Sequence, residues 1–300
     1  MAMTPSSPVR PHVGRFAPSP SGPLHFGSLV AALGSFLQAR SQQGRWLVRI
    51  EDIDPPREMA GASGLILQTL EAHGLGWDGE VMFQSARHGR YDEIIDQLYR
   101  AGDLYWCRCT RREIMAAGGF YNGHCRPLGL TAEGCAARLR QHNPVYHFED
   151  ELQGHIAVPA ALAEEDFIVR RRDGLYAYNL AVVVDDMDSG ITEIVRGADL
   201  LEPTVRQIAL YQTLGADVPA WVHLPLAVLA DGNKLSKQNH APALAHDDVR
   251  PALWQALAFL GQCPPPCLRE NTVDEIIAWG IAHWQLARVP RQQKIVLGAR

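Results

Sequence analysis

The sequence predicts a protein of the α/β class whose first elements form a βαβ unit. Residues 12–17 are a short, mostly apolar run that is typical of a strand. Residues 18–23 are rich in proline, serine and glycine, and apolar side chains then recur at helical spacing over 29–37. A second strand is predicted over 45–51. In such a unit the ligand binds at the carboxyl ends of the strands.

The loop after the first strand has the composition of an anion-binding site. Glycine and serine let a ligand approach the backbone, and the free amides at a helix start attract negative charge. His25, Gly27 and Ser28 lie at this helix start. A histidine two residues before a glycine is, by itself, more often a capping or core histidine than a ligand.

A second polar motif late in the chain favours the functional interpretation. Lys234 and Lys237 are three residues apart in a polar loop that follows a glycine, and Gln238 ends the motif. Two such lysines can both reach a polyphosphate. Each motif alone is weak, whereas the two together favour a site for a polyphosphate.

Carboxylates cluster at the predicted end of the second strand. Glu51, Asp52 and Asp54 lie within four residues, and they repel one another unless an ammonium group, a metal or an arginine lies among them. Asp54 precedes a proline and is equally well explained as a helix N-cap. We expect Glu51 to be functional, because it would lie beside the loop that carries Arg15 and Ser19.

Three cysteines in a glycine-rich segment indicate a metal site. Cys107, Cys109 and Cys125 suit a tetrahedral zinc ion with a structural role. The fourth ligand is open: His124 is adjacent to Cys125 and would need awkward geometry, whereas Tyr121 could bind as a phenolate whose pKa the metal lowers. The alternative is a set of free structural cysteines.

The rest of the chain is predicted to mix helices, strands and turns. We expect a hairpin over 167–178. A strand over 191–195 places Arg196 at its carboxyl end, where Arg196 is either a functional residue or a structural ion-pair partner of Asp199. Tyr99 is expected on the buried face of its helix. Helices are predicted over 59–75, 87–100, 131–141 and 203–214, with a helical pattern broken by prolines from 247 to 300.

Composition limits the class of protein. The 300 residues are 47% hydrophobic and 20% charged, which predicts a folded chain with a sizeable core. There is no apolar run of about 18 residues and no signal-peptide core, and six uneven cysteines do not suit a disulfide scaffold, so we expect a cytoplasmic protein without a membrane span. A net charge of −5 argues against binding nucleic acid by bulk electrostatics, although local basic patches remain.

The two phosphate-binding motifs resemble the ATP signatures of class I aminoacyl-tRNA synthetases, His-Ile-Gly-His and Lys-Met-Ser-Lys-Ser. Four further stretches are similar to the glutamyl branch of that class, namely 15–22, 49–54, 176–181 and 195–200. Ordinary glutamyl-tRNA synthetases carry large anticodon-reading domains after the lysine motif, whereas only 62 residues follow Gln238 here. The chain therefore resembles the truncated paralogues, the glutamyl-queuosine tRNA(Asp) synthetases, whose Cys-x-Cys…Tyr-x-x-x-Cys zinc pattern it shares.

This resemblance implies a Rossmann-like class I catalytic fold with an inserted zinc-containing α/β subdomain, a short helical C-terminal region and no anticodon-binding domain. The expected divisions are a flexible tail (1–11), the first half of the catalytic domain (12–104), the zinc insertion (105–165), the second half with the lysine loop (166–240) and the helical region (241–300).

The resemblance also implies an activity and a site. The family activates L-glutamate with ATP and Mg²⁺, without needing tRNA, and transfers it to the queuosine base in the anticodon loop of tRNA(Asp). The implied residues are Arg15, Phe16, Ala17, Pro18, Ser19, Glu51, Tyr178 and Arg196 for glutamate; His25, Gly27, Ser28 and Lys237 for ATP; His25, Lys234 and Lys237 for catalysis; and Cys107, Cys109, Tyr121 and Cys125 for one structural Zn²⁺. Ser28 and Gln238 depart from the family motifs.

Two alternatives accompany this interpretation. The chain could be an ordinary glutamyl-tRNA synthetase that acts on a tRNA 3′ end, or an inactive paralogue that binds tRNA or an amino acid. Retention of Arg15, Glu51, Arg196 and Lys237 argues against the inactive paralogue, because a decayed site should lose its charges first. We expect a monomer whose partners are glutamate, ATP and tRNA(Asp).

Overall fold

The computed structural model describes residues 11–229, 242–245 and 247–297. The lysine motif at 234–238 and most of the predicted N-terminal tail lie outside the described residues. Among the described helices, none is long and apolar enough to span a membrane.

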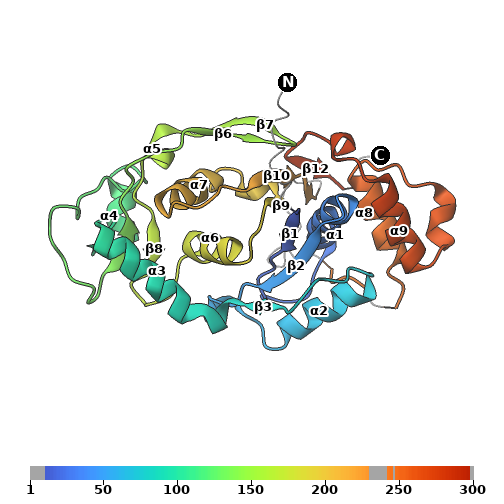
Figure 1. Cartoon of the computed structure of the whole chain (residues 1–300), viewed down its shortest axis with the longest axis horizontal. Helices are drawn as coiled ribbons and strands as arrows, with labels where there is room; N and C mark the ends of the chain where they lie inside the picture. The colour runs from blue at the N-terminus through green and yellow to red at the C-terminus, as the bar shows by residue number, and fades with distance from the viewer. Residues whose placement is uncertain (1–10, 230–241, 246, 298–300) are drawn as a thin grey trace, which may run out of the picture.

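Short strands paired in parallel occupy the centre of the molecule (Figure 1). They are β1 (Val13–Phe16), β2 (Arg45–Ile50), β3 (Met82–Phe83), β9 (Glu193–Gly197) and β10 (Ala220–Leu224). β2 pairs with both β1 and β3, and β9 pairs with β10. The Thr192 amide donates a hydrogen bond to the Val13 carbonyl, and this bond joins β9 to β1. The predicted βαβ unit is confirmed.

Helix α1 (Phe26–Ser41) is buried along most of its length. The central strands cover one side, while α8 (Arg250–Phe259) and α9 (Val273–His283) pack on it from another (Figure 1). A Cβ on Gly34 would lie 2.5 Å from Cδ1 of Leu224, so glycine permits the close approach of α1 to β10. This packing fixes the start of α1 against the ends of the strands.

Four further helices surround the strands: α2 (Ala62–Ala72), α3 (His88–Ala101), α6 (Tyr178–Asp188) and α7 (Thr204–Thr213). Three of them confirm predicted helices to within a few residues, and α6 had no predicted counterpart. Tyr99 was wrongly placed on the buried face of α3: its side chain is 53% exposed. The buried stripe of α3 consists of Tyr91, Ile94, Ile95 and Leu98.

A second group of elements extends from one end of the molecule, where α4 (Arg111–Ala116) lies, along its edge to the central strands (Figure 1). They are β4 (Leu104–Cys107), α4, β5 (Ala136–Leu139), β6 (His147–Asp150), β7 (Gly154–Ala157), α5 (Ala160–Ala163) and β8 (Ile168–Arg170). β5 pairs antiparallel with β4 and β8, so the predicted helix over 131–141 is wrong. All four β5 side chains are buried, because the strand lies between two neighbours. The predicted Asp-Gly turn is confirmed: Arg171 N–H donates to the Leu175 carbonyl, and Gly174 adopts φ +89°. The second arm of the predicted hairpin is not a strand: it makes a single bridge, Arg170 to Tyr176, and helix α6 begins at Tyr178.

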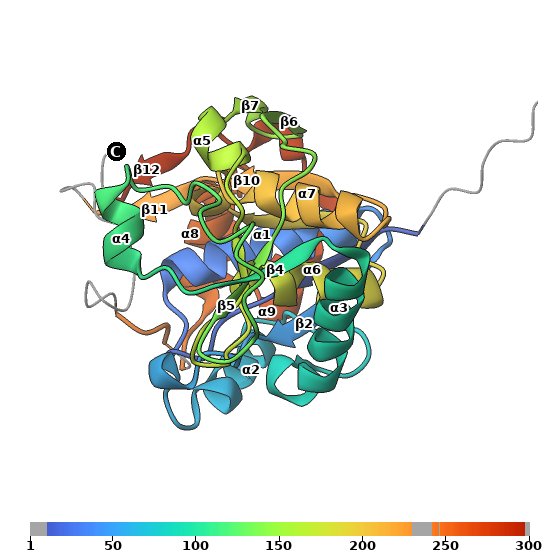
Figure 2. The same cartoon turned by 90° about the vertical axis from the view of Figure 1, so that its left-hand side faces the viewer.

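The C-terminal region is only partly helical. After α8 and α9, β12 (Lys294–Val296) pairs in parallel with β11 (Leu226–Val228), which follows β10. Short 3-10 helices occur at Pro55–Arg57, Gln84–Arg87, Ala198–Leu200, Pro266–Glu270 and Leu286–Arg288. The β6–β7 hairpin reaches back from the opposite end and lies over β10 in both views (Figures 1 and 2).

Candidate active site

A cavity of about 400 Å³ opens where β1, β9 and β10 end and α1 begins. Its walls include every described residue of the predicted glutamate and ATP sites. These are Arg15, Phe16, Ala17, Pro18, Ser19, His25, Gly27, Ser28, Glu51, Tyr178 and Arg196. The remaining members of those sets, Lys234 and Lys237, lie outside the described residues.

The cavity also has walls that the sequence analysis missed. Gly197, Asp199 and Leu200 continue from the end of β9, and residues 224–227 continue from the end of β10. Their position in the sequence could have predicted this, because residues that follow the carboxyl ends of adjacent parallel strands lie at the same edge of the sheet.

A buried cluster of charges lies beneath the cavity. Arg15 donates to Asp186 through Nε at 3.1 Å and Nη2 at 3.3 Å. Arg49 donates to Asp186 Oδ1 at 2.6 Å and to Glu51 Oε1 at 3.2 Å, and its Nε lies 3.7 Å from Asp185. Burial by itself would raise the pKa of Asp186, but the charges of Arg15 and Arg49 outweigh it and hold that pKa below its usual range.

Glu51 is the carboxylate that reaches the cavity. Its side chain is almost fully buried, and burial raises its pKa against the opposing effects of Arg49 and Arg15. The clustered carboxylates of residues 51–54 were expected to need an ammonium group, a metal or an arginine among them. For Glu51 that group is Arg49. An ammonium group bound in the cavity would stabilise the ionised carboxylate further.

The two other carboxylates of this segment have different surroundings. Asp52 accepts hydrogen bonds from the Ser85 amide and hydroxyl, and therefore holds the following chain in place. Asp54 precedes a 3-10 helix but makes no side-chain cap. It forms ion pairs instead with Arg57 at 3.2 Å and Arg171 at 3.3 Å.

Arg196 is a buried guanidinium group held by neutral partners. It donates to His223 Nε2 at 3.0 Å, to Thr204 Oγ1 at 2.7 Å and to the Tyr178 hydroxyl at 3.5 Å. Within the described part of the chain, none of its hydrogen-bond partners is a carboxylate; the suggested ion pair with Asp199 is not among them. Burial lowers the pKa of Arg196, and so does the nearby charge of Arg15. A buried cation with neutral partners at a cavity wall favours an anionic ligand.

His25 caps helix α1 and lines the cavity. Its Nδ1 accepts a hydrogen bond from the Ser28 amide at 3.3 Å. In the neutral ring the proton is therefore on Nε2, which is a hydrogen-bond donor. Ser28, which departs from the family motif, fixes this orientation through its backbone.

A second cavity of about 830 Å³ adjoins the first. The two share Ser19, Ser21, Glu51 and Tyr178, and the second extends to the turn between β8 and α6. Its other walls include Asp54, Arg57, Glu58, Arg171 and Tyr176. The shared residues form the boundary between the two spaces.

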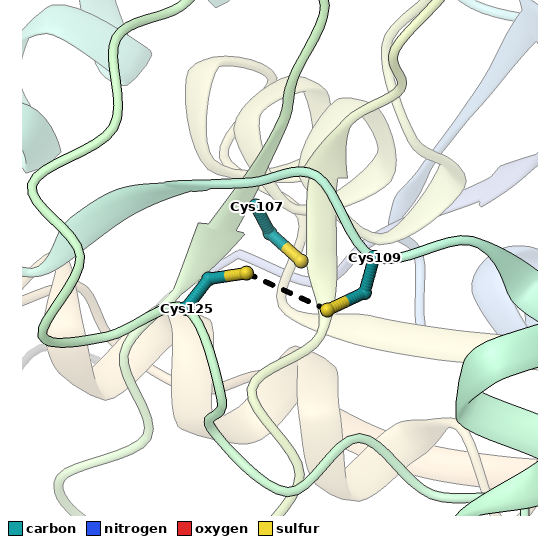
Figure 3. Close-up of side chains that lie close together, drawn as sticks. All are labelled: Cys107, Cys109 and Cys125. Atoms are coloured by element: carbon teal, nitrogen blue, oxygen red, sulfur yellow. Dashed lines mark hydrogen bonds between the residues drawn. The ribbon is translucent and has the colours of Figure 1, made fainter.

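The three predicted cysteine ligands converge in the insertion (Figure 3). The Sγ atoms of Cys107, Cys109 and Cys125 all lie within 4.8 Å of one another. The Tyr121 hydroxyl accepts a hydrogen bond from the Cys125 amide at 2.7 Å, whereas His124 is not part of this group. Burial and the neighbouring thiols raise the pKa of Cys109 to about 12, so three thiolates would need a cation to coexist. The donor set fits a tetrahedral zinc ion.

Comparison with known proteins identifies the family of the chain. The sequence family "tRNA synthetases class I (E and Q), catalytic domain" matches residues 12–120 and 129–271. A curated relative from Pectobacterium atrosepticum, named Glutamyl-Q tRNA(Asp) synthetase, is 62% identical over 95% of this chain and 88% of its own length.

Solved structures of longer proteins share the fold. The glutamate-tRNA synthetase of Elizabethkingia anophelis is similar with a TM-score of 0.78 and 25% identity, over 95% of this chain and 68% of that one. A glutamate tRNA ligase from Elizabethkingia meningosepticum, in complex with its amino acid, gives a TM-score of 0.77 and 25% identity, over 93% of this chain and 66% of that one.

The family match and the fold thus define a class I tRNA synthetase catalytic domain of the glutamate and glutamine type. Within that class, the chain belongs to the glutamyl-Q tRNA(Asp) synthetase family.

Proposed function

We propose that the protein activates L-glutamate with ATP, without needing tRNA for this step, and transfers the glutamate to the queuosine base of tRNA(Asp). The observation that carries this proposal is one cavity that combines Arg196, a buried cation with neutral partners, with the buried carboxylate of Glu51. The names of the curated relatives support the same reaction.

Glutamate matches the charges of the cavity. Arg196 binds one carboxylate of the substrate, because it has a positive charge and, among the residues that the structure describes, no carboxylate as a hydrogen-bond partner. Glu51 binds the ammonium group, which offsets the cost of ionising a buried acid. Arg15 adds positive charge at the same wall, and Tyr178 adds a hydroxyl.

ATP binds at the start of α1. The amide of Gly27, the His25 Nε2–H donor and the two motif lysines, Lys234 and Lys237, contact its phosphates together with Mg²⁺. A substrate carboxylate oxygen attacks the α-phosphorus, the bond to the bridging oxygen breaks, and pyrophosphate leaves. The protein contributes position and positive charge where negative charge grows.

The second cavity gives the acceptor a route to the activated carboxyl group. It meets the first cavity at Glu51 and Tyr178, so a nucleoside placed there would reach the glutamyl-adenylate. The choice of acceptor follows the curated relatives, which are named Glutamyl-Q tRNA(Asp) synthetase. One structural zinc ion stabilises the insertion, held by Cys107, Cys109, Tyr121 and Cys125. We further propose that the protein acts as a monomer in the cytoplasm.

Glutamate-dependent exchange of pyrophosphate into ATP tests the activation step. We expect exchange with glutamate in the absence of tRNA, and none with glutamine or aspartate. Arg196→Ala should lower the exchange rate at least about 100-fold, because a buried charged hydrogen bond to the substrate is lost, while ATP binding measured by calorimetry stays within about twofold. Exchange that requires tRNA, or a wild-type rate in Arg196→Ala, would contradict the proposal.

A further inference from the structure

His223 connects Arg196 to a residue outside the cavity. It lies on β10 and is fully buried. Its Nε2 lies 3.0 Å from Arg196 Nε and its Nδ1 lies 2.6 Å from Asp150 Oδ2. An arginine Nε always carries a hydrogen, so His223 Nε2 must accept. The ring proton is therefore on Nδ1 and is donated to Asp150.

Asp150 is itself fixed by the backbone. Its Oδ1 accepts hydrogen bonds from the amides of Leu152 at 3.1 Å, Gln153 at 2.8 Å and His223 at 3.3 Å. The Gln153 side-chain amide also donates to the His223 carbonyl at 2.8 Å. These hydrogen bonds join the turn between β6 and β7 to β10, and Figures 1 and 2 show the hairpin over this strand. Asp150 presents only Oδ2 to the ring.

The histidine holds one edge of the guanidinium group while a threonine holds another. Thr204 Oγ1 accepts from Arg196 Nη2 at 2.7 Å and itself donates to the Leu200 carbonyl at 2.8 Å. Neither Asp150 nor His223 lines the cavity. Burial and the charge of Arg196 lower the pKa of His223 despite Asp150, which keeps the ring neutral and able to accept.

We propose that Asp150 and His223 are positioning residues: together they fix the tautomer that orients Arg196 toward glutamate. The β6–β7 hairpin extends to β10 from the end of the molecule where α4 lies (Figure 1). It therefore helps to set the affinity of the cavity for the substrate. This inference rests on the proposed role of Arg196 as a carboxylate ligand.

Asp150→Asn tests the tautomer with little change of shape. Asn Oδ1 can keep the three backbone hydrogen bonds, so its NH₂ group replaces Oδ2 and donates to His223 Nδ1. The ring proton then moves to Nε2 and faces Arg196 Nε–H, which places two donors against each other. We expect the KM for glutamate in pyrophosphate exchange to rise about tenfold or more, and the KM for ATP to stay within about twofold.

Two substitutions of His223 provide a matched pair. In His223→Gln the longer amide can reach the Nε2 position and accept from Arg196, whereas in His223→Asn the shorter amide reaches only the Nδ1 position. Glutamine should therefore retain more glutamate affinity than asparagine, at similar midpoints of thermal unfolding. Equal loss in both variants would show that His223 only fills space, and would overturn the proposal even if Asp150→Asn fails to fold.

The histidine tautomer gives a readout that does not depend on activity. Nitrogen-15 NMR of side-chain-labelled histidine should show His223 protonated at Nδ1 in the wild type and at Nε2 in Asp150→Asn. A switched tautomer with an unchanged KM for glutamate would overturn the positioning role. If the wild type shows no glutamate-dependent exchange, it is the proposed function that fails, while the tautomer result still tests the hydrogen bonds.

Discussion

Arg49 neutralises the acidic groups beneath the cavity. It contacts Asp186 and Glu51 directly and lies close to Asp185, and all of these side chains are buried. Buried charges are costly unless they are paired, so Arg49 makes it possible to keep Glu51 at the cavity wall. Asp186 in turn orients Arg15. In the proposed reaction, the substrate would therefore meet side chains that are already held in place.

The raised pKa of Glu51 predicts a pH dependence of glutamate binding. A bound ammonium group favours the ionised carboxylate, so it lowers the pKa of Glu51 in the complex, and binding releases a proton when the free enzyme is protonated. The KM for glutamate should therefore rise as pH falls through the raised pKa of the free enzyme. Pyrophosphate exchange at saturating ATP, over about pH 5 to 8, measures this.

Glu51→Gln is the control for this prediction. The variant should bind glutamate about tenfold or more weakly near pH 7, because a charged hydrogen bond is lost. Its KM should lack the pH dependence, since the amide does not titrate. A variant that keeps the wild-type pH profile would assign the titration to another group.

Residues that belong to local motifs could be predicted from the sequence, whereas their supports could not. Arg15 and Glu51 each lie at the end of a predicted strand, so their meeting follows from the βαβ unit. Arg49 and Asp186 are 137 residues apart, and nothing in either local pattern indicates their contact. The same holds for His223 and Asp150, which are 73 residues apart.

Among the elements, β5 shows why one prediction was wrong. Residues 131–141 contain alanine, leucine and arginine, which favour a helix by intrinsic propensity. Pairing with β4 and β8 overrides that propensity, because the strand buries all four of its side chains between two neighbours. The unit of β1, α1 and β2 was predictable because its loop, spacing and cap are all local.

Zinc is expected to hold the segment between β4 and β5. Cys109→Ser should abolish the single zinc ion per chain that we expect in the wild type, measured by elemental analysis of purified protein. Loss of the ion should lower the midpoint of thermal unfolding by about 5 °C, because the metal closes the loop between Cys109 and Cys125.

Cys263→Ser is the matched control, since Cys263 is an exposed free cysteine outside the cluster. It should keep its zinc and its stability. Unchanged metal content in Cys109→Ser would contradict the zinc assignment. The variant Tyr121→Phe tests the fourth ligand, because it should weaken zinc binding without removing a thiol.

At the scale of the whole molecule, the proposed catalytic cavity lies between two different flanks. The insertion with its cysteine cluster occupies one end, and α8 and α9 occupy the other (Figure 1). The β6–β7 hairpin links the insertion side to β10 through Asp150 and His223. The fold class followed from the motifs, but this link did not, because it depends on how the insertion folds back onto the strands.

The most direct test of the proposed reaction is to supply ATP and radiolabelled glutamate with three acceptors: tRNA(Asp) that contains queuosine, the same tRNA without it, and tRNA(Glu). We predict label only on the queuosine form, retained when its 3′-terminal adenosine has been removed and recovered in the anticodon-loop fragment after nuclease digestion. Label on tRNA(Glu) that disappears when the 3′-terminal adenosine is removed would contradict the proposal and assign the protein to the ordinary glutamyl-tRNA synthetases.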